Sequence, residues 1–304
     1  MDRIVLDSAR RGIRQQFLDD KAEELAASLP PLLVAAERLA SSVSLGVHGR
    51  RKAGMGESFW QFRRYAPEDP SGAIDWRQSA KSQHLFVRER EWEAAEAVWF
   101  WRDGSATMQF KSQYADTSKV DRATVLGLAL ASLLVRGGER IALVGNGHAP
   151  ASGRATLRRI ARELLSQQSN SRALPPDAPV TRNSQCVWLS DFLSPIPEIE
   201  AAVRRLSSAG LTGHMVHVID PAEDDFPFAG RMRFESLESS DTELFGRAES
   251  VQSAYRARFR THGEAVRALT RRLGWSYLTH RTDKRPETAL IALYTEIAGE
   301  RNRV

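Results

Sequence analysis

The stretch 96–110, "EAVWFWRDGSATMQF", ends an apolar run with one acid and two hydroxyl residues. Residues 98–101 are all apolar or aromatic, which is typical of a strand buried on both faces of a sheet. Asp103, Ser105 and Thr107 follow at every second position. Because alternate residues of a loop can turn their oxygen atoms toward one point, this spacing predicts a polar site where the strand ends.

The pattern around this stretch alternates apolar strands with amphipathic helices. It predicts an α/β fold with a doubly wound, mostly parallel sheet that is covered on both faces. Residues 231–238 predict an additional edge strand, and residues 171–184 a loop. Besides 97–103, the predicted strands are 140–146, 186–191, 214–220 and 275–280, and the predicted helices are 118–136, 154–168, 196–209, 248–272 and 287–299.

The first third of the chain has a different character. Residues 17–42 have helical periodicity that is interrupted at Pro30 and Pro31. Residues 45–91 are rich in glycine, proline and turn residues, with short strand-like pieces. We therefore predict two parts, an N-terminal helical and β-containing unit over 1–92 and an α/β domain over 93–304.

Composition limits the class of protein. The 304 residues contain 42% hydrophobic and 27% charged residues, with a formal net charge of +5, as in ordinary globular proteins. No apolar run approaches the ~20 residues that a membrane span needs, and the N-terminus lacks a signal-peptide pattern. One cysteine, Cys186, excludes an intramolecular disulfide. These features favour a cytoplasmic protein.

Two further residues are expected beside the first loop. Ligands of doubly wound sheets bind beyond the carboxyl ends of the strands. Asp191 ends the predicted strand 186–191, and Thr156 follows the predicted strand 140–146. Carboxylate and hydroxyl oxygens are the ligands that Mg²⁺ prefers, so the sequence predicts a magnesium site at this edge. A plain polar turn at Asp103, and a Thr156 that only begins its helix, remain alternatives.

The loop also resembles a known metal site. "RDGSATM" (102–108) is similar to the metal-ion-dependent adhesion site of von Willebrand factor A-type domains. The resemblance implies that Asp103, Ser105 and Thr107 are ligands from the first loop. It implies that Thr156 is the threonine of the second loop and Asp191 the acid of the third.

A longer segment resembles the signature of the bacterial domain of unknown function 58 family. "FRRYAPEDPSGAIDWRQSAKSQHLFVRE" (62–89) follows the pattern R-x-Y-x-P-G-D-D-P-R-x-I-D-W-x-x-x-A-R, and the resemblance extends over roughly 40–300. It implies a von Willebrand A-like interaction module that works beside a MoxR-type AAA+ ATPase in complex assembly or metal insertion. The matching positions are Arg63, Tyr65, Pro67, Asp69, Ile74, Asp75, Trp76 and Ala80, and the departures include Glu68, Pro70, Gly72 and Lys81.

Within this signature we expect a structural role for the aspartate and the tryptophan. Trp76 offers a large surface for burial. Asp75 could form an ion-paired brace with Arg63 and Arg64 between the small unit and the sheet. Tyr65 and Asp69 belong to the same predicted structural or interaction segment.

Two other functions remain open from the sequence. Asp103 could be the nucleophile of a metal-dependent phosphohydrolase, although Ser105 stands where a second acid would serve as general acid. The basic and aromatic run 49–65 could bind nucleic acid, although a solvated basic face is the simpler interpretation. The sequence contains neither a P-loop nor a G-x-S-x-G nucleophile elbow.

Overall fold

The chain separates into two compact units in a computed structural model. Residues 31–48, 59–66, 74–82, 84–90, 97–166, 172–237 and 241–301 are described. The small unit spans 45–95, and the large unit combines the chain up to Ser44 with the chain from Glu96 onward. Helix α2 (Pro31–His48), which starts at the predicted proline break, thus belongs mainly to the large unit. The expected boundary near 92 lies close to the one found, whereas the N-terminal helix does not group with the signature segment.

The large unit contains a five-stranded sheet. Every neighbouring pair of strands in it is parallel. An isolated bridge between Ile141 and Ala151, next to this sheet, is antiparallel. The α/β fold with a mostly parallel sheet is therefore confirmed. The strands, in the order β4-β3-β5-β6-β9, are β4 (Arg140–Leu143), β3 (Ala97–Arg102), β5 (Ser184–Ser190), β6 (Leu211–Ile219) and β9 (Ser276–Arg281).

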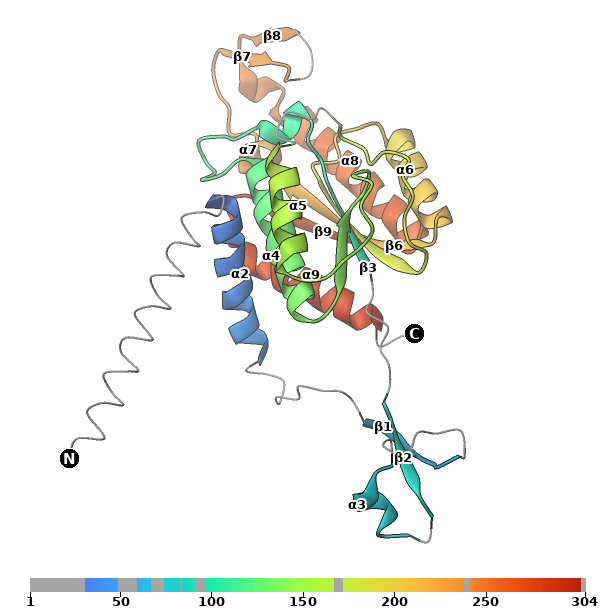
Figure 1. The fold of residues 1–304 in the computed structure, drawn as a ribbon. Helices are drawn as coiled ribbons and strands as arrows, with labels where there is room; N and C mark the ends of the chain where they lie inside the picture. The colour runs from blue at the N-terminus through green and yellow to red at the C-terminus, as the bar shows by residue number, and fades with distance from the viewer. Residues whose placement is uncertain are drawn as a thin grey trace, which may run out of the picture. The chain divides into compact units, whose positions relative to one another are not determined.

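Helices cover both faces of this sheet, as Figure 1 shows. Helix α4 packs against α5 and α9 on one face, while α6 packs against α8 on the other. This arrangement is doubly wound, and it is consistent with a von Willebrand A-like domain. No helix in the described part of the chain is long and apolar enough to cross a membrane. The bounds are α4 (Lys119–Arg136), α5 (Arg154–Ser166), α6 (Ile196–Ser208), α8 (Gln252–Arg272) and α9 (Pro286–Arg301).

The core between the sheet and α6 and α8 is rich in tryptophan. Trp99, Trp101 and Trp188 belong to it, together with the fully buried Cys186. Trp275, just before β9, lies over Gly213 of β6 so closely that a β-carbon at 213 would lie 2.2 Å from its ring. A glycine is therefore required where β6 passes beneath this side chain.

The predicted edge strand at 231–238 does not join the main sheet. It forms β7 (Met232–Glu235), which pairs antiparallel with β8 (Thr242–Phe245) in a separate hairpin. Figure 1 shows this hairpin beyond α7 (Pro221–Asp225). Phe226 stacks on Phe234 with their ring centroids 5.7 Å apart, so aromatic packing holds the hairpin to the segment after α7.

The small unit is a two-stranded antiparallel sheet with one helical turn. Strands β1 (Phe59–Arg64) and β2 (Phe86–Arg90) pair, and α3 (Trp76–Ser79) precedes β2. Asp75 caps α3 by accepting the N–H of Gln78 at 2.9 Å. The N–H of Tyr65 donates to the carbonyl of Leu85 at 2.9 Å.

The signature residues are only partly within the described structure. Trp76 is 65% exposed, so the expectation that it is buried is wrong for the described residues. Trp76 comes directly after the capping Asp75, in the first turn of α3. A helix of only four residues offers little surface against which the ring could be buried. Asp69 lies outside the described residues, as does the side chain of Arg63, and the predicted brace therefore stays a prediction.

Candidate functional site at the carboxyl ends of β3 and β5

The direction in which strands are added to the sheet reverses between β3 and β5. The chain passes from β3 to β4 on one side of β3 and then returns to β5 on its other side. Ligands of open α/β sheets bind at such a switch point, beyond the carboxyl ends of the two strands. Asp103 comes directly after β3, and Asp191 directly after β5. The structure thus brings the two predicted acids to one edge of the sheet.

The carboxylate of Asp103 is fully buried and held from two sides. Its Oδ1 accepts the backbone N–H of Ser105 at 2.8 Å, and its Oδ2 accepts the hydroxyl of Ser190 at 2.6 Å. The Ser190 oxygen in turn accepts the N–H of Phe192 at 2.9 Å. The two strand ends are therefore connected through the carboxylate of Asp103.

The two hydroxyl residues of the first loop lie side by side. The Oγ of Ser105 is 3.0 Å from the Oγ1 of Thr107, at the start of a 3₁₀ turn (Ala106–Gln109). Ser105 is buried and Thr107 is half-buried. Thr107 is thus the member of the predicted loop set that solvent or a ligand can reach.

A lysine provides the positive charge of this site. The Nζ of Lys119, in the first turn of α4, lies 2.9 Å from Oδ2 of Asp191 and also contacts Glu223 of α7. The side chain of Lys119 is fully buried. Burial by itself lowers the pKa of Lys119, but Asp191 and Glu223 outweigh this effect and raise its pKa above the ordinary value. The lysine is therefore charged and forms a buried ion pair with two acids.

Two more acids, Asp220 and Glu223, lie at the same edge of the sheet, at the start of α7. Asp220, directly after β6, is fully buried and accepts the N–H groups of Ser112 and Ala222 at 2.9 and 2.8 Å. Glu223 accepts the N–H of Asp220 at 2.9 Å, which makes a capping box at the start of α7. This box fixes the carboxylate of Glu223 where it meets Lys119.

The backbone turns sharply after Asp191. Phe192 has a φ of 49°, a left-handed conformation that is costly for a side chain of this size. Its ring packs edge-on against Trp188 and His217, with centroids 5.3 and 5.8 Å away. This packing and the hydrogen bond to Ser190 hold the turn, and so fix the position of Asp191.

The negative charge of Asp103 is less well balanced. Burial, followed by the charge of Asp191, raises the pKa of Asp103 to about 6, although hydrogen bonds from Ser105 and Ser190 lower it. Burial also raises the pKa of Glu223, against the effect of Lys119. Lys119 contacts Asp191 and Glu223 but not Asp103, whose charge interacts with the buried guanidinium of Arg102.

The structure corrects the expectation that Thr156 reaches this edge. After β4 the chain turns back, and Ala151 pairs antiparallel with Ile141, near the amino end of that strand. Thr156 comes five residues later, in the first turn of α5, and its hydroxyl donates to the carbonyl of Ser152 at 3.1 Å. It therefore lies toward the opposite end of the sheet from Asp103 and takes the alternative role at a helix start.

The predicted magnesium ligands fit the structure in part. Asp103, Ser105 and Thr107 offer adjacent oxygens of the kind that Mg²⁺ prefers. Asp191 is engaged by Lys119, and its Oδ1 accepts the N–H of Leu193 at 3.2 Å. No cluster of three or more His, Cys, Asp or Glu side chains in the described ranges is arranged to hold a metal. Metal binding here would thus depend on the two hydroxyls.

Sequence reasoning missed Lys119, Ser190, Asp220 and Glu223, although signals for three of them exist. A lysine in the first turn opposes the helix dipole, which signals a specific acidic partner. Asp220 ends a third parallel strand, as Asp103 and Asp191 end the first two. Asp220 and Glu223 have the spacing of a capping box. Nothing in the sequence distinguishes Ser190 from an ordinary strand residue.

We call the mostly buried cluster of Asp103, Lys119, Asp191 and Glu223 the polar centre. An open apolar groove of about 730 Å³ adjoins it. Thr107 and Glu223 line its polar end, and the aromatic residues Phe110, Phe226 and Phe234 line its walls. Leu193, which is 41% exposed, also lines it. The edge of the sheet therefore presents a half-exposed hydroxyl beside a hydrophobic surface.

Comparisons with known proteins address the predicted family. A family model described as "Protein of unknown function DUF58" matches residues 61–267, more than half of the chain. The chain belongs to the DUF58 family. This confirms the resemblance predicted from the signature segment.

Two curated relatives of this DUF58 protein are mycobacterial. The uncharacterized protein Rv1480 of Mycobacterium tuberculosis is 27% identical in an alignment of 276 residues that covers 86% of this chain and 86% of that protein. The uncharacterized protein Mb1516 of Mycobacterium bovis matches to the same extent.

Two solved structures are also similar. One is an aerotolerance-related membrane protein from Bacteroides fragilis, with 16% identity, 67% of this chain and all of that chain covered, and a TM-score of 0.38. The other is the conserved hypothetical protein BatB from Bacteroides thetaiotaomicron, with 12% identity, 68% and 100% coverage, and a TM-score of 0.35. A likeness at this level says nothing about the function of this DUF58 protein.

Proposed function

We propose that this DUF58 protein is a non-enzymatic interaction module that docks a protein partner at the carboxyl-end edge of its sheet. One observation carries the proposal: the half-exposed Thr107 lies where a buried polar centre meets an open apolar groove. Such a surface offers hydrophobic area for affinity and a polar group for orientation. The side chains beneath this surface are fixed by buried hydrogen bonds, so binding of a partner costs little conformational entropy.

Mg²⁺ is the proposed cofactor of this edge. Asp103, Ser105 and Thr107 would hold the ion, which would supply positive charge for an acidic residue of the partner. Asp103 carries negative charge that Lys119 does not contact. Asp191 would contribute only after Lys119 had moved away from it.

The candidate partner is a MoxR-type AAA+ ATPase, in complex assembly or metal insertion. This part of the proposal is supported by the family resemblance of the signature segment and not by a contact in the structure. The cytoplasmic location expected from the sequence also stays a prediction. Recovery of most of the protein in the membrane fraction after a high-salt wash would contradict it.

The two alternative functions have less support. A phosphohydrolase needs a nucleophile that its substrate can reach. Asp103 is fully buried, and both of its oxygens accept hydrogen bonds from the protein. For nucleic-acid binding through 49–65, the described structure covers only the residues from Phe59 onward, as part of β1. That alternative stays a prediction, tested by salt-dependent DNA binding.

The proposal is tested by capture of the partner. The full chain, immobilised, is mixed with a MoxR-type AAA+ ATPase from the same organism in Mg²⁺ or in EDTA. Leu193→Asp should reduce capture strongly, because it places a charge in the groove. The matched control is Leu244→Asp, since Leu244 is 59% exposed and does not line the groove.

The outcomes separate the parts of the proposal. Loss of capture in Leu193→Asp but not in Leu244→Asp supports docking in the groove, and loss in EDTA supports the role of Mg²⁺. Equal capture by wild type and Leu193→Asp contradicts docking at this edge. Equal capture in Mg²⁺ and EDTA contradicts the metal while leaving the groove in place.

A further inference from the structure

Strand β9 is an outer strand of the main sheet, and its free side carries unused backbone groups. Among the strands that the structure describes, it pairs only with β6. The N–H of Thr282 donates to the carbonyl of Ile219 on β6 at 2.9 Å. Because successive residues of a strand point their backbone groups in opposite directions, Tyr277 and Thr279 direct their N–H and C=O groups away from β6. A free edge of this kind is a template for one more strand.

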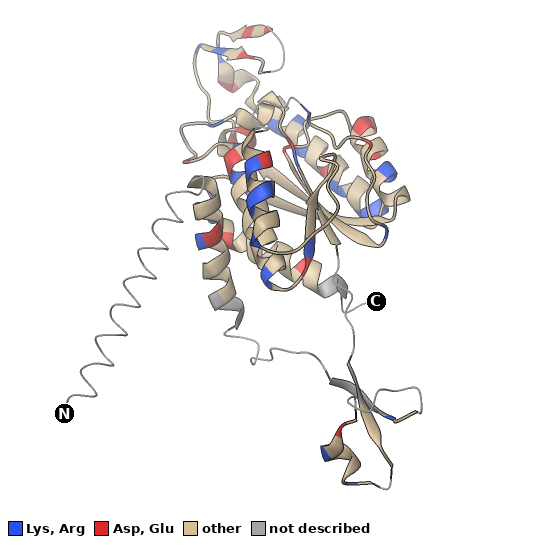
Figure 2. Ribbon diagram, viewed as in Figure 1, with Lys and Arg blue, Asp and Glu red and all other residues tan. Residues whose placement is uncertain are grey.

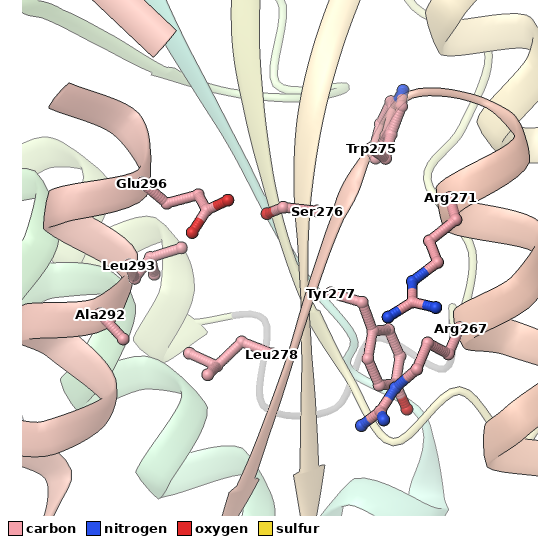
Figure 3. A pocket seen from close by; sticks show the side chains of 9 residues that line it. All are labelled: Arg267, Arg271, Trp275, Ser276, Tyr277, Leu278, Ala292, Leu293 and Glu296. Atoms are coloured by element: carbon pink, nitrogen blue, oxygen red, sulfur yellow. The ribbon is translucent and has the colours of Figure 1, made fainter. Parts of the chain in front are cut away.

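A hollow of about 410 Å³ lies along this edge, between α8 and α9. Figure 3 shows Arg267 and Arg271 extending from α8 toward β9, on the side of Tyr277. On the other side of the strand, Leu278 faces Leu293 of α9. The two sides of the hollow therefore differ. The α8 side is basic, whereas the α9 side is apolar at Leu278 and Leu293 and carries one acid, Glu296.

Arginine dominates the helix on the basic side. Helix α8 contains six arginines and one glutamate, a net charge of +5. Figure 2 marks arginine and lysine positions of the chain in blue. Among the described side chains, Arg267 and Arg271 have no acidic partner, whereas the next arginine, Arg272, binds Glu200 at 2.8 Å. The guanidinium of Arg267 lies 5.3 Å from the ring centre of Tyr277. The hollow thus keeps two positive charges available beside the free backbone.

We propose that β9 binds an extended acidic segment of a partner protein, which adds a sixth strand to the sheet. The main-chain groups of Tyr277 and Thr279 would pair with the segment. Side chains of the segment alternate between its faces. Those on the α8 side would be acidic and meet Arg267 and Arg271, while those on the α9 side would be apolar and meet Leu278 and Leu293.

Charge and chemistry select this occupant over two others. A second copy of the chain, paired edge to edge, would bring the arginines of two α8 helices together, which is repulsive. A nucleic acid would meet the arginines, but its phosphates cannot donate hydrogen bonds to the outward carbonyls of β9. An acidic peptide satisfies both the backbone and the charges. This surface is separate from the polar centre, and the proposal does not depend on Mg²⁺.

The test uses synthetic peptides of about eight residues, a length that spans the ~20 Å of β9. One peptide alternates glutamate and valine, and the other has the same composition in two blocks. Binding to the full chain is measured by fluorescence anisotropy, together with amide exchange. The alternating peptide should bind at least about tenfold more tightly, more weakly at high salt, and slow exchange at Tyr277 and Thr279.

Two kinds of variant separate the charge from the backbone. Arg267→Glu with Arg271→Glu should weaken binding about tenfold or more, whereas Arg258→Glu, on the same helix but outside the hollow, should not. Thr279→Pro removes an outward N–H without removing a bond to β6, so it should abolish binding while the fold is kept. The control is Thr279→Ala, which retains the N–H.

Several results would overturn the proposal. Equal affinity for the alternating and block peptides would do so, as would unchanged affinity in the double arginine variant. A single-stranded oligonucleotide that bound more tightly than the alternating peptide would assign the surface to nucleic acid instead. If Thr279→Pro fails to fold, the arginine variants and the exchange pattern still decide the outcome.

Discussion

The ammonium nitrogen of Lys119 lies 2.9 Å from Oδ2 of Asp191, and the two side chains are 0% and 3% exposed. A buried ion pair of this kind is not strong evidence for added stability, because both charges lose their hydration. Removing one partner is costly, however, since it leaves the other charge buried and unpaired. Lys119 therefore acts as the resident counter-ion of Asp191 and Glu223.

Lys119→Met should lower the free energy of unfolding by about 3–5 kcal/mol in EDTA. It leaves Asp191 and Glu223 without their cation, beside Asp103. The same variant should regain part of its stability in Mg²⁺, because a cation that binds only the native state stabilises it. Urea unfolding in both buffers measures this, with the exposed Lys111→Met as control. Equal stability of Lys119→Met and wild type in EDTA would contradict the counter-ion role.

Asp103→Asn should raise the free energy of unfolding by about 1 kcal/mol at pH 7 in EDTA. The raised pKa of Asp103 means that its charged form is disfavoured in the native state, and the substitution removes that charge. If Mg²⁺ binds this loop, wild type should melt at a higher temperature in Mg²⁺, and the variant should not respond. A variant that responds to Mg²⁺ as wild type does would show that Asp103 is not a ligand.

Acid should destabilise the fold through three buried histidines. Burial lowers the pKa of His214, His217 and His280 to about 4 each, whereas the unfolded chain titrates near 6.5. Below pH ~6.5 the unfolded state therefore binds more protons, so stability is lost as pH falls toward 4. Asp103, whose pKa is raised, has the opposite but smaller effect.

The expected loss between pH 7 and pH 5 is about 4 kcal/mol, measured by urea unfolding at each pH. His214→Gln should reduce this loss by about 2 kcal/mol, nearly half of it. His214 lies 2.8 Å from the hydroxyl of Ser276 and 3.3 Å from Oε1 of Gln185, contacts that a neutral ring satisfies. A slope that His214→Gln leaves unchanged would exclude it as a source of the acid sensitivity.

Gly213→Ala should destabilise the large unit by about 2 kcal/mol or more, because the new methyl group would overlap the ring of Trp275. Gly127→Ala is the matched control. Its β-carbon would lie 3.5 Å from Leu189, an ordinary contact, and alanine is favoured inside a helix by about 1 kcal/mol. Trp275→Leu should partly restore the stability of the Gly213→Ala variant, whereas the same substitution should destabilise wild type. An additive double variant would contradict the packing explanation.

The sequence predicted the sheet well because its strands are continuous apolar runs. β3, β5 and β6 begin and end within about three residues of the predicted strands, a usual margin for element boundaries. Asp103 and Asp191 were placed at the correct edge of the sheet because each directly follows one of these strands. Parallel strands separated by helices point their carboxyl ends the same way, so an acid at the end of each strand needs no further information.

The errors concern contacts that the local sequence does not encode. Thr156 was placed by assuming that the chain goes directly from β4 into a helix, but the return pairing of Ala151 with Ile141 moves it to the other end of the sheet. β7 has the composition of an edge strand, yet its partner is β8. Lys119 meets Asp191 across 72 residues, a pairing that only the packing of α4 beside β5 reveals.

The central position of the single cysteine provides an intrinsic measure of opening. Cys186 has no exposed surface, and burial raises the pKa of its thiol to about 12. A thiol reagent therefore cannot react with it until β5 separates from its neighbours. Its labelling rate in the unmodified protein reports how often the centre of the sheet opens. A cysteine introduced on the surface, by contrast, would be the only thiol to react with a probe, so Cys186 would not have to be replaced.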